Sequence, residues 1–178
     1  MPFASTHIVG GYLTGKLAQK IKNISFSHYA WFFIIFGALH PDSDFILEWV
    51  FKYDAHRTFT HSLFFLIAAP FITYLLFKLL KHKEARIFAM CLALGNGSHL
   101  ILDSISDKGV PLLWPSQYYI STYNGIYLAQ PTPSFLDAPI ESLRHFLKLA
   151  ILDMAIGTAF LFYLWWKKEL VFSKEGAK

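Results

Sequence analysis

Cysteine and charge are both scarce in this chain of 178 residues. Cys91 is the only cysteine, which excludes an internal disulfide framework and a cysteine-rich zinc finger. Charged residues make up 16% of the chain, whereas an average soluble domain carries about 25%. Hydrophobic residues make up 54%, which excludes intrinsic disorder. The composition therefore indicates a small integral membrane protein.

The chain also lacks internal repeats and low-complexity runs, and we expect no cleaved signal peptide because its start has no basic cluster with an uninterrupted apolar core. Long apolar stretches are present instead. Four of them read as membrane spans: residues 29–47, 62–80, 87–102 and 149–166. Buried helices of a soluble protein are the alternative, but four such stretches would leave too little polar surface.

A milder helical pattern covers residues 6–21, where Gly10, Gly11 and Gly15 would allow close packing against a neighbouring helix. We therefore expect an all-α fold, an integral membrane helical bundle of four to five spans with a polar metal-binding cluster at one membrane face. Residues 1–178 would form one domain, with a loop insert at about 104–147 on the extracytoplasmic side.

The lysines and arginines predict the orientation of this bundle. Eleven of the sixteen fall on one face, which the positive-inside rule assigns to the cytoplasm. They are Lys16, Lys20, Lys22, Lys78, Lys81, Lys83, Arg86, Lys167, Lys168, Lys174 and Lys178. Orientation thus explains the pI of about 9.1, and no nucleic-acid partner is expected. The predicted location is a bacterial-type cytoplasmic (inner) membrane.

Histidines and aspartates gather at the opposite ends of the expected spans. The seven are His7, Asp42, Asp44, His56, His61, His99 and Asp103. Ionisable groups at membrane depth are costly and are functional candidates by default. An interhelical hydrogen bond explains any single one of them equally well. Seven on one face favour a metal cluster, facing the extracytoplasmic side.

The spacing of these residues supports metal binding. His99 and Asp103 are four residues apart, so both point to one face of a helix. Asp42 and Asp44 flank a single residue just after a proline, and such a turn can aim both carboxylates at one cation or at two. Imidazole with carboxylate favours zinc, manganese or iron over calcium and magnesium.

Other polar residues have structural explanations. Thr60 and Ser62 could orient the histidines or cap the helix that begins there. Asp153 stands without a motif inside the last span, where an interhelical polar contact is the simpler interpretation.

Three ordered motifs stand out along the chain: PDSD at 41–44, HRTFTHS at 56–62 and SHLILDSISDKGVPLLWP at 98–115. Together with the early His7 they resemble the YdjM-like family of membrane-bound, metal-dependent hydrolases, over roughly residues 1–145. A more distant similarity runs to zinc-dependent phospholipase C and P1-type nucleases. The resemblance implies a ligand set of His7, Asp42, Asp44, His56, His61, His99 and Asp103, with Glu141 as a further candidate.

The chain departs from that family in two places that bear on the ligands. Phe45 stands where the family commonly has histidine, and His40 stands where it commonly has leucine. His40 could replace the lost imidazole, or one metal site could be weakened. His145, one turn after Glu141, is a weaker candidate.

These observations predict a hydrolase that uses two or more zinc ions, with manganese and iron as alternatives. A multinuclear cluster favours phosphoester chemistry, and its place at the membrane interface favours a phospholipid or a lipid-linked phosphate. Asp42 or Glu141 is the candidate general base. Arg57 is the candidate clamp for a substrate phosphate, and a salt bridge to Asp54 is the alternative.

Aromatic residues of the loop insert form a candidate lid, with an interfacial aromatic belt as the alternative. They are Trp114, Tyr118, Tyr119 and Tyr123. The competing functions are a metal transporter and a non-catalytic membrane protein with a structural metal site. Transport is disfavoured because transporters place ligands near the bilayer midplane, often within structural repeats.

Overall fold

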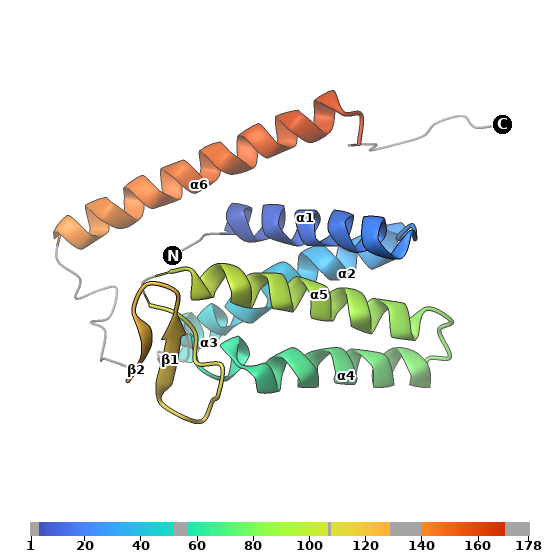
Figure 1. Cartoon of the computed structure of the whole chain (residues 1–178), viewed down its shortest axis with the longest axis horizontal. Coiled ribbons are helices and arrows are strands. Elements are labelled where there is room, and N and C mark those ends of the chain that lie inside the picture. Colours follow the sequence, from blue (N-terminus) through green and yellow to red (C-terminus); the bar gives the residue numbers. More distant parts are fainter. Residues whose placement is uncertain (1–3, 52–56, 107, 129–139, 170–178) are drawn as a thin grey trace.

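The computed structural model describes residues 4–51, 57–106, 108–128 and 140–169, and it is mostly helical, as the sequence predicts (Figure 1). The elements are α1 (Ala4–Lys22), α2 (His28–Leu39), the 3-10 turn η1 (His40–Asp44), α3 (Phe45–Phe51), the 3-10 turn η2 (Phe59–His61), α4 (Leu63–Leu79), α5 (Ala85–Ser104), β1 (Tyr118–Ser121), β2 (Gly125–Leu128) and α6 (Ile140–Trp166). The two strands form an antiparallel hairpin with Tyr118 opposite Leu128.

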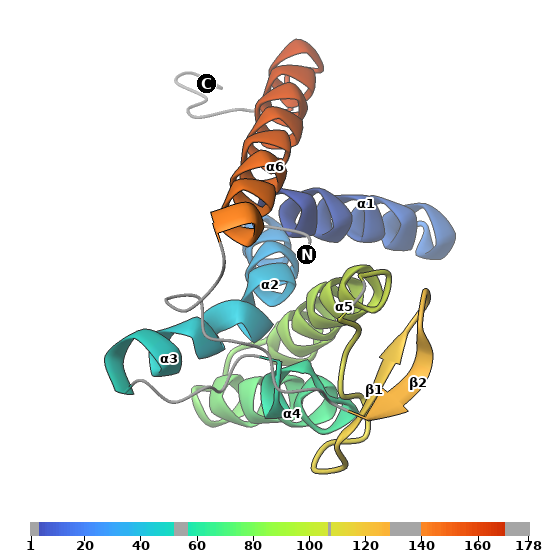
Figure 2. The same ribbon diagram turned by 90° about the vertical axis from the view of Figure 1, so that its left-hand side faces the viewer.

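Helix α5 is the centre of the bundle and packs against α1, α2 and α4. Helix α6 packs on α1 and stands apart from the other helices in both views (Figures 1 and 2). The difference is visible in burial, because 56% of the apolar window of α5 is buried but only 11% of that of α6. Helix α5 is therefore the element best placed to hold a buried site.

Glycines set the close approach of α5 to α2. A Cβ built on Gly95 of α5 would lie 2.1 Å from the carbonyl oxygen of Ile34, and one built on Gly37 of α2 would lie 2.5 Å from that of Leu92. The predicted glycine contacts of α1 are also confirmed, since a Cβ on Gly15 would lie 2.5 Å from the ring of Trp31. Only glycine allows backbones to come this close.

Local sequence signals explain where the helices begin and end. Ser27 and Ser62 are the N-caps of α2 and α4, each accepting a backbone N–H three residues further on. This confirms the predicted capping role of Ser62. Pro41 is the second residue of η1, which begins at His40 directly after α2, and proline cannot supply the N–H that would continue the helix. The polar run therefore leaves the helix and forms a 3-10 turn.

Two helices of the described part are long and apolar enough to cross a membrane, namely α5 and α6. Helix α4 is a shorter apolar helix of 17 residues, or about 26 Å at 1.5 Å per residue. Helix α2 has only 12 residues before η1 interrupts it. The prediction of four to five spans goes beyond this finding and remains a prediction.

The predicted loop at 104–147 contains more regular structure than expected. It holds the β1–β2 hairpin, whose turn carries Asn124 and Gly125, a pair that favours hairpin turns. Helix α6 begins at Ile140, before the apolar stretch that starts at residue 149. The intervening residues include Glu141, Arg144 and Lys148, which do not suit a bilayer core but are good helix formers.

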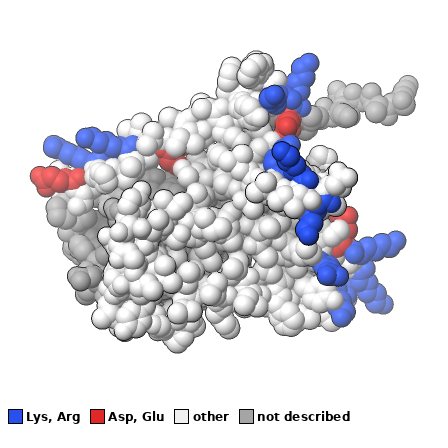
Figure 3. Space-filling model, in the orientation of Figure 1, with Lys and Arg blue, Asp and Glu red and all other residues white. Residues whose placement is uncertain are grey.

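Charged residues lie at the two ends of the bundle, and exposed apolar residues lie between them. Lysines and arginines gather at the end where α1, α4 and α6 terminate and α5 begins, with a smaller group near the start of α6 (Figure 3). Between the ends, large apolar side chains of α4 and α6 are exposed, for example Ile67 at 70% and Met154 at 69%. Such a wide apolar surface suits contact with lipid.

Candidate metal centre

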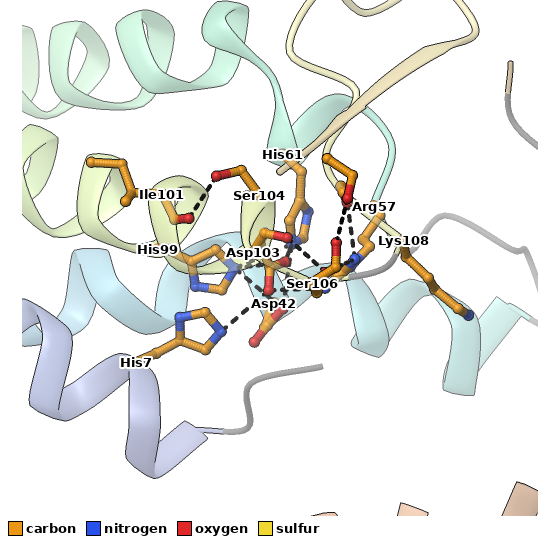
Figure 4. A network of polar contacts seen from close by, with 12 residues as sticks. His7, Asp42, Arg57, His61, His99, Ile101, Asp103, Ser104, Ser106 and Lys108 are labelled. Atoms are coloured by element: carbon orange, nitrogen blue, oxygen red, sulfur yellow. Dashed lines mark hydrogen bonds and ion pairs between the residues drawn. The ribbon is translucent and has the colours of Figure 1, made fainter. Parts of the chain in front are cut away.

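Four side chains from three elements converge at the end of the bundle opposite the main group of lysines (Figure 4). Asp42 comes from η1, His61 ends η2, and His99 and Asp103 lie one turn apart on α5. Each offers one ligand atom, and these four atoms all lie within 4.8 Å of one another. The structure therefore brings together three regions of the sequence, each of which carries one of the three motifs.

Five of the six distances among these atoms are close to those of a tetrahedral site. Donors held about 2.1 Å from a tetrahedral ion lie about 3.4 Å from one another. His61 Nε2 is 3.4 Å from Asp42 Oδ1 and 3.3 Å from Asp103 Oδ2. His99 Nε2 is 3.5 Å and 3.7 Å from the same two oxygens, and the two Nε2 atoms are 3.2 Å apart. The group could hold a divalent cation, which would also offset the charge of the two carboxylates, buried Asp103 and partly exposed Asp42.

A backbone hydrogen bond sets the tautomer of His99. Its Nδ1 lies 2.8 Å from the carbonyl oxygen of Ala38 on α2. A carbonyl only accepts, so Nδ1 must carry the hydrogen and Nε2 presents a lone pair to the site. Such a bond orients an imidazole and raises its basicity as a metal ligand.

Asp44 lies behind His61 rather than among the four converging atoms. Its Oδ2 is 3.3 Å from His61 Nδ1 and accepts hydrogen bonds from the Thr60 hydroxyl at 2.6 Å and the Arg57 backbone N–H at 3.1 Å. The Thr60 hydroxyl is also 3.0 Å from His61 Nδ1, so the predicted orienting role of Thr60 is confirmed. In the sequence, Asp44 could be recognised only as a carboxylate. A carboxylate can either bind a metal or orient a histidine that binds it, so the sequence did not separate these two roles.

Three carboxylates determine the protonation of His61. Burial alone would lower its pKa, but hydrogen bonding to Asp103, Asp42 and Asp44 outweighs burial and raises the pKa to about 10. Both ring nitrogens of His61 therefore carry a hydrogen in the metal-free protein, and a cation that binds Nε2 displaces the one on that nitrogen.

Arg57 is buried beside Asp103, with only 3% of its surface exposed. Its Nη2 is 2.9 Å from Asp103 Oδ1, while Nη1 donates to Ser106 Oγ at 3.0 Å and to the Gly109 carbonyl at 2.9 Å. The carbonyl of Arg57 accepts from the hydroxyl of Tyr119 at 2.8 Å. The structure thus places Arg57 between α5 and the hairpin, where it orients Asp103. Asp54, its other suggested partner, lies outside the described residues.

His7 of α1 lies beside the group of four, against His99 and Asp103 of α5. Its ring stacks on that of His99 with centroids 3.8 Å apart, and its Nε2 is 3.6 Å from Asp103 Oδ1. The side chain is 1% exposed, and neither ring nitrogen has a hydrogen-bond partner among the described residues. A buried imidazole without partners is costly, and a second cation between His7 and Asp103 would satisfy it.

The remaining candidates lie elsewhere. Glu141 is exposed in the first turn of α6, outside the group of four, and His145 is exposed on the same helix. The ring of His40 lies between those of Phe36 and Phe65, each with its centroid 5.0 Å away. His56 lies outside the described residues.

The predicted lid residues lie on or near the hairpin. Tyr118 and Tyr123 are exposed, while Tyr119 is tied to Arg57 as described above. Trp114 packs near Phe59 and Phe64. Neither the lid nor the aromatic belt is decided by these contacts, and both remain predictions.

Comparison with known proteins now identifies the family. The chain matches the family described as YdjM inner membrane protein over residues 1–171. The chain belongs to the YdjM family. It is also similar to the uncharacterized protein YvsG of Bacillus subtilis (strain 168), with 31% identity over 109 residues, which is 61% of this chain and 56% of that protein. The match thus spans about half the length of that relative, and no solved structure matches the chain.

Membership in the YdjM family implies association with the inner membrane, in agreement with the two candidate spans. It also confirms the family resemblance read from the three motifs. The family description names no reaction.

Proposed function

We propose that this YdjM family protein is a membrane-bound metal-dependent hydrolase that cleaves a phosphoester bond. The observation that carries the proposal is the near-tetrahedral spacing of Asp42, His61, His99 and Asp103. Carboxylates and imidazoles that converge in this way suit a divalent cation, which would offset the negative charge that Asp42, Asp44 and Asp103 retain beside Arg57 and His61.

The donor set favours zinc, with manganese and iron as alternatives, because imidazole and carboxylate suit these ions. Asp103 has the geometry of a bridging ligand. Its Oδ2 faces His61 and His99, while its Oδ1 faces His7 and also pairs with Arg57 Nη2. We therefore propose two or more cations, one in the group of four and another between Asp103 and His7.

Bound cations of this kind supply a Lewis acid and an acidified water molecule. The chain itself supplies the route of approach and the proton acceptor. The Asp42 side chain is 25% exposed, whereas the other three are at most 2% exposed. Asp42 therefore stands at the mouth of the site, where it can take a proton from the attacking water and return it to the leaving oxygen as the P–O bond breaks. Glu141 remains a predicted alternative base.

The proposed substrate is a phospholipid or a lipid-linked phosphate. The site lies at the end of the bundle opposite the main basic end, which the positive-inside rule places in the cytoplasm. This arrangement supports a site at the extracytoplasmic interface, the depth of lipid headgroups. The bilayer is then both the environment of the protein and the source of its substrate.

The test begins with metal content. Full-length protein purified in detergent is analysed by elemental mass spectrometry. It is then assayed for release of the phosphorylated headgroup from short-chain phospholipids and of inorganic phosphate from lipid diphosphates. His99→Ala should lose metal and activity together, while the matched control His28→Ala, an exposed histidine at the start of α2, should keep both.

Other results would contradict the proposal. A metal-free protein that takes up no zinc or manganese on reconstitution would exclude the metal centre. Metal that is bound and lost in His99→Ala, with loss of thermal stability but no hydrolysis of any phosphoester offered, would indicate a structural site instead. Metal flux into proteoliposomes without hydrolysis would indicate a transporter.

A further inference from the structure

A buried carboxylate lies in the middle of the most exposed helix of the bundle. Asp153 is near the centre of α6, yet its exposed fraction is only 6%. A charge within an apolar span is costly unless a partner satisfies it. The partners of Asp153 therefore show what stabilises its charge inside the bundle.

Those partners belong to the first turn of α1. Asp153 Oδ2 accepts the backbone N–H of Ser5 at 3.0 Å, and Oδ1 accepts the backbone N–H of Thr6 at 2.8 Å and its hydroxyl at 2.5 Å. The first N–H groups of a helix have no partner within it. Asp153 thus caps α1 from another helix, and its negative charge also suits the positive end of the α1 dipole.

The glycine one turn later on α6 makes this docking possible. A Cβ on Gly157 would lie 2.6 Å from Ser5 Oγ and 2.9 Å from Ser5 Cβ. Asp153 and Gly157 together form a socket that fixes the start of α1 in position along α6. The predicted interhelical contact of Asp153 is therefore confirmed, and it also fixes where α1 begins relative to α6.

The residue that follows this anchored turn is His7. Its ring nitrogens have no hydrogen-bond partner among the described residues, and Nε2 makes only the 3.6 Å contact with Asp103 Oδ1. The position of the ring therefore depends on that contact, on the stacking against His99 and on the placement of α1. We infer that Asp153 is a positioning residue of the metal centre, which holds His7 at the second cation by anchoring α1. This inference rests on the function proposed above.

The experiment compares Asp153→Ala, His7→Ala and the double variant of the full-length protein in detergent. Each is stripped of metal and titrated with Co²⁺, with binding followed by the visible absorption of the ion. Removing a group that orients a ligand costs about ten- to one-hundred-fold in affinity. We expect losses of this size in both single variants and no further loss in the double variant, because both changes remove the same ligand.

The control is Glu169→Gln, which alters the polar contacts that Glu169, just beyond α6, makes with Tyr12 and Lys16 of α1. Glu169 pairs with Lys16 at 2.9 Å, nine residues beyond His7 along α1. Its loss should leave Co²⁺ binding unchanged. Asp153→Asn, which keeps one accepting oxygen, should show an intermediate loss, and it serves in place of Asp153→Ala if the alanine variant does not fold.

The rise in melting temperature on adding Co²⁺ separates positioning from plain stability. A residue that only anchors helices would lower the melting temperature of the metal-free protein and leave that rise unchanged. That result, or additive losses of affinity in the double variant, would overturn the inference while leaving the proposed function intact. A wild-type protein that binds no Co²⁺ or zinc would overturn both.

Discussion

His99 donates its Nδ1 hydrogen to the carbonyl of Ala38, 2.8 Å away, where glycines of α2 and α5 lie against each other. The metal-facing nitrogen of one helix is thus oriented by the backbone of another. Packing between Gly37 and Gly95 brings the two backbones near enough for this bond. The site therefore depends on glycines that contact no ligand.

Two glycines on α5 allow this dependence to be tested. In Gly95→Ala the new Cβ would meet the Ile34 carbonyl at 2.1 Å, and backbone atoms cannot give way. We expect a loss of about 1–3 kcal/mol in stability, as for other overpacked cores, together with weaker metal binding. Gly97→Ala is the control, because its Cβ would find Leu66 Cδ1 at 3.9 Å and alanine favours a helix. Thermal unfolding measures the stability of the two variants, and equal melting temperatures for Gly95→Ala and Gly97→Ala would contradict the argument.

Asp44→Asn tests whether Asp44 orients His61 or binds metal itself. The amide keeps the shape of the side chain but removes the charge that faces His61 Nδ1 at 3.3 Å. We expect metal affinity to fall about ten- to one-hundred-fold with the number of ions per chain unchanged. Ser43→Ala, at the exposed neighbouring position, should behave as wild type. A lower number of ions in Asp44→Asn would instead make Asp44 a ligand.

Arg57→Lys tests the two interpretations of the arginine. A lysine cannot contact Asp103, Ser106 and the Gly109 carbonyl at once, because it lacks the planar fork of the guanidinium. We expect lower thermal stability and weaker metal retention. For Arg57→Ala, which leaves Asp103 buried without its partner, the loss should approach about 3–5 kcal/mol. A raised KM with unchanged stability and metal content would instead support the phosphate clamp.

Surface labelling tests the orientation of the bundle. Cys91 is 1% exposed, so the native protein should react little with an impermeant maleimide. Gln117→Cys lies beside the hairpin, near the end with the metal centre, and should react in intact cells. Lys168→Cys, just beyond α6, should react only after the inner membrane is opened. The reverse pattern would place the metal centre on the cytoplasmic side and remove the argument for an extracytoplasmic substrate.

Periodicity and local chemistry were enough to predict the helices and several details of the site. The four-residue spacing of His99 and Asp103 places both on one face of a helix wherever that helix goes. Pro41 ends α2 for a reason internal to the backbone, and this puts Asp42 in a turn. Such local rules missed the first turns of α6, which begins at Ile140 and runs through polar residues before the apolar stretch at 149. Helix formation does not require a continuous apolar stretch.

The sequence by itself determined the membrane class, the family, the helical pattern and the list of candidate ligands, because composition, periodicity and motif spacing are properties of the chain. Only the tertiary structure decided how the candidates divide: Asp42, His61, His99 and Asp103 converge, Asp44 stands behind His61, and Asp153 caps α1. A carboxylate can ligate, orient or cap with the same chemistry. Which of these it does depends on distances between helices far apart in the sequence, and those distances are set by packing.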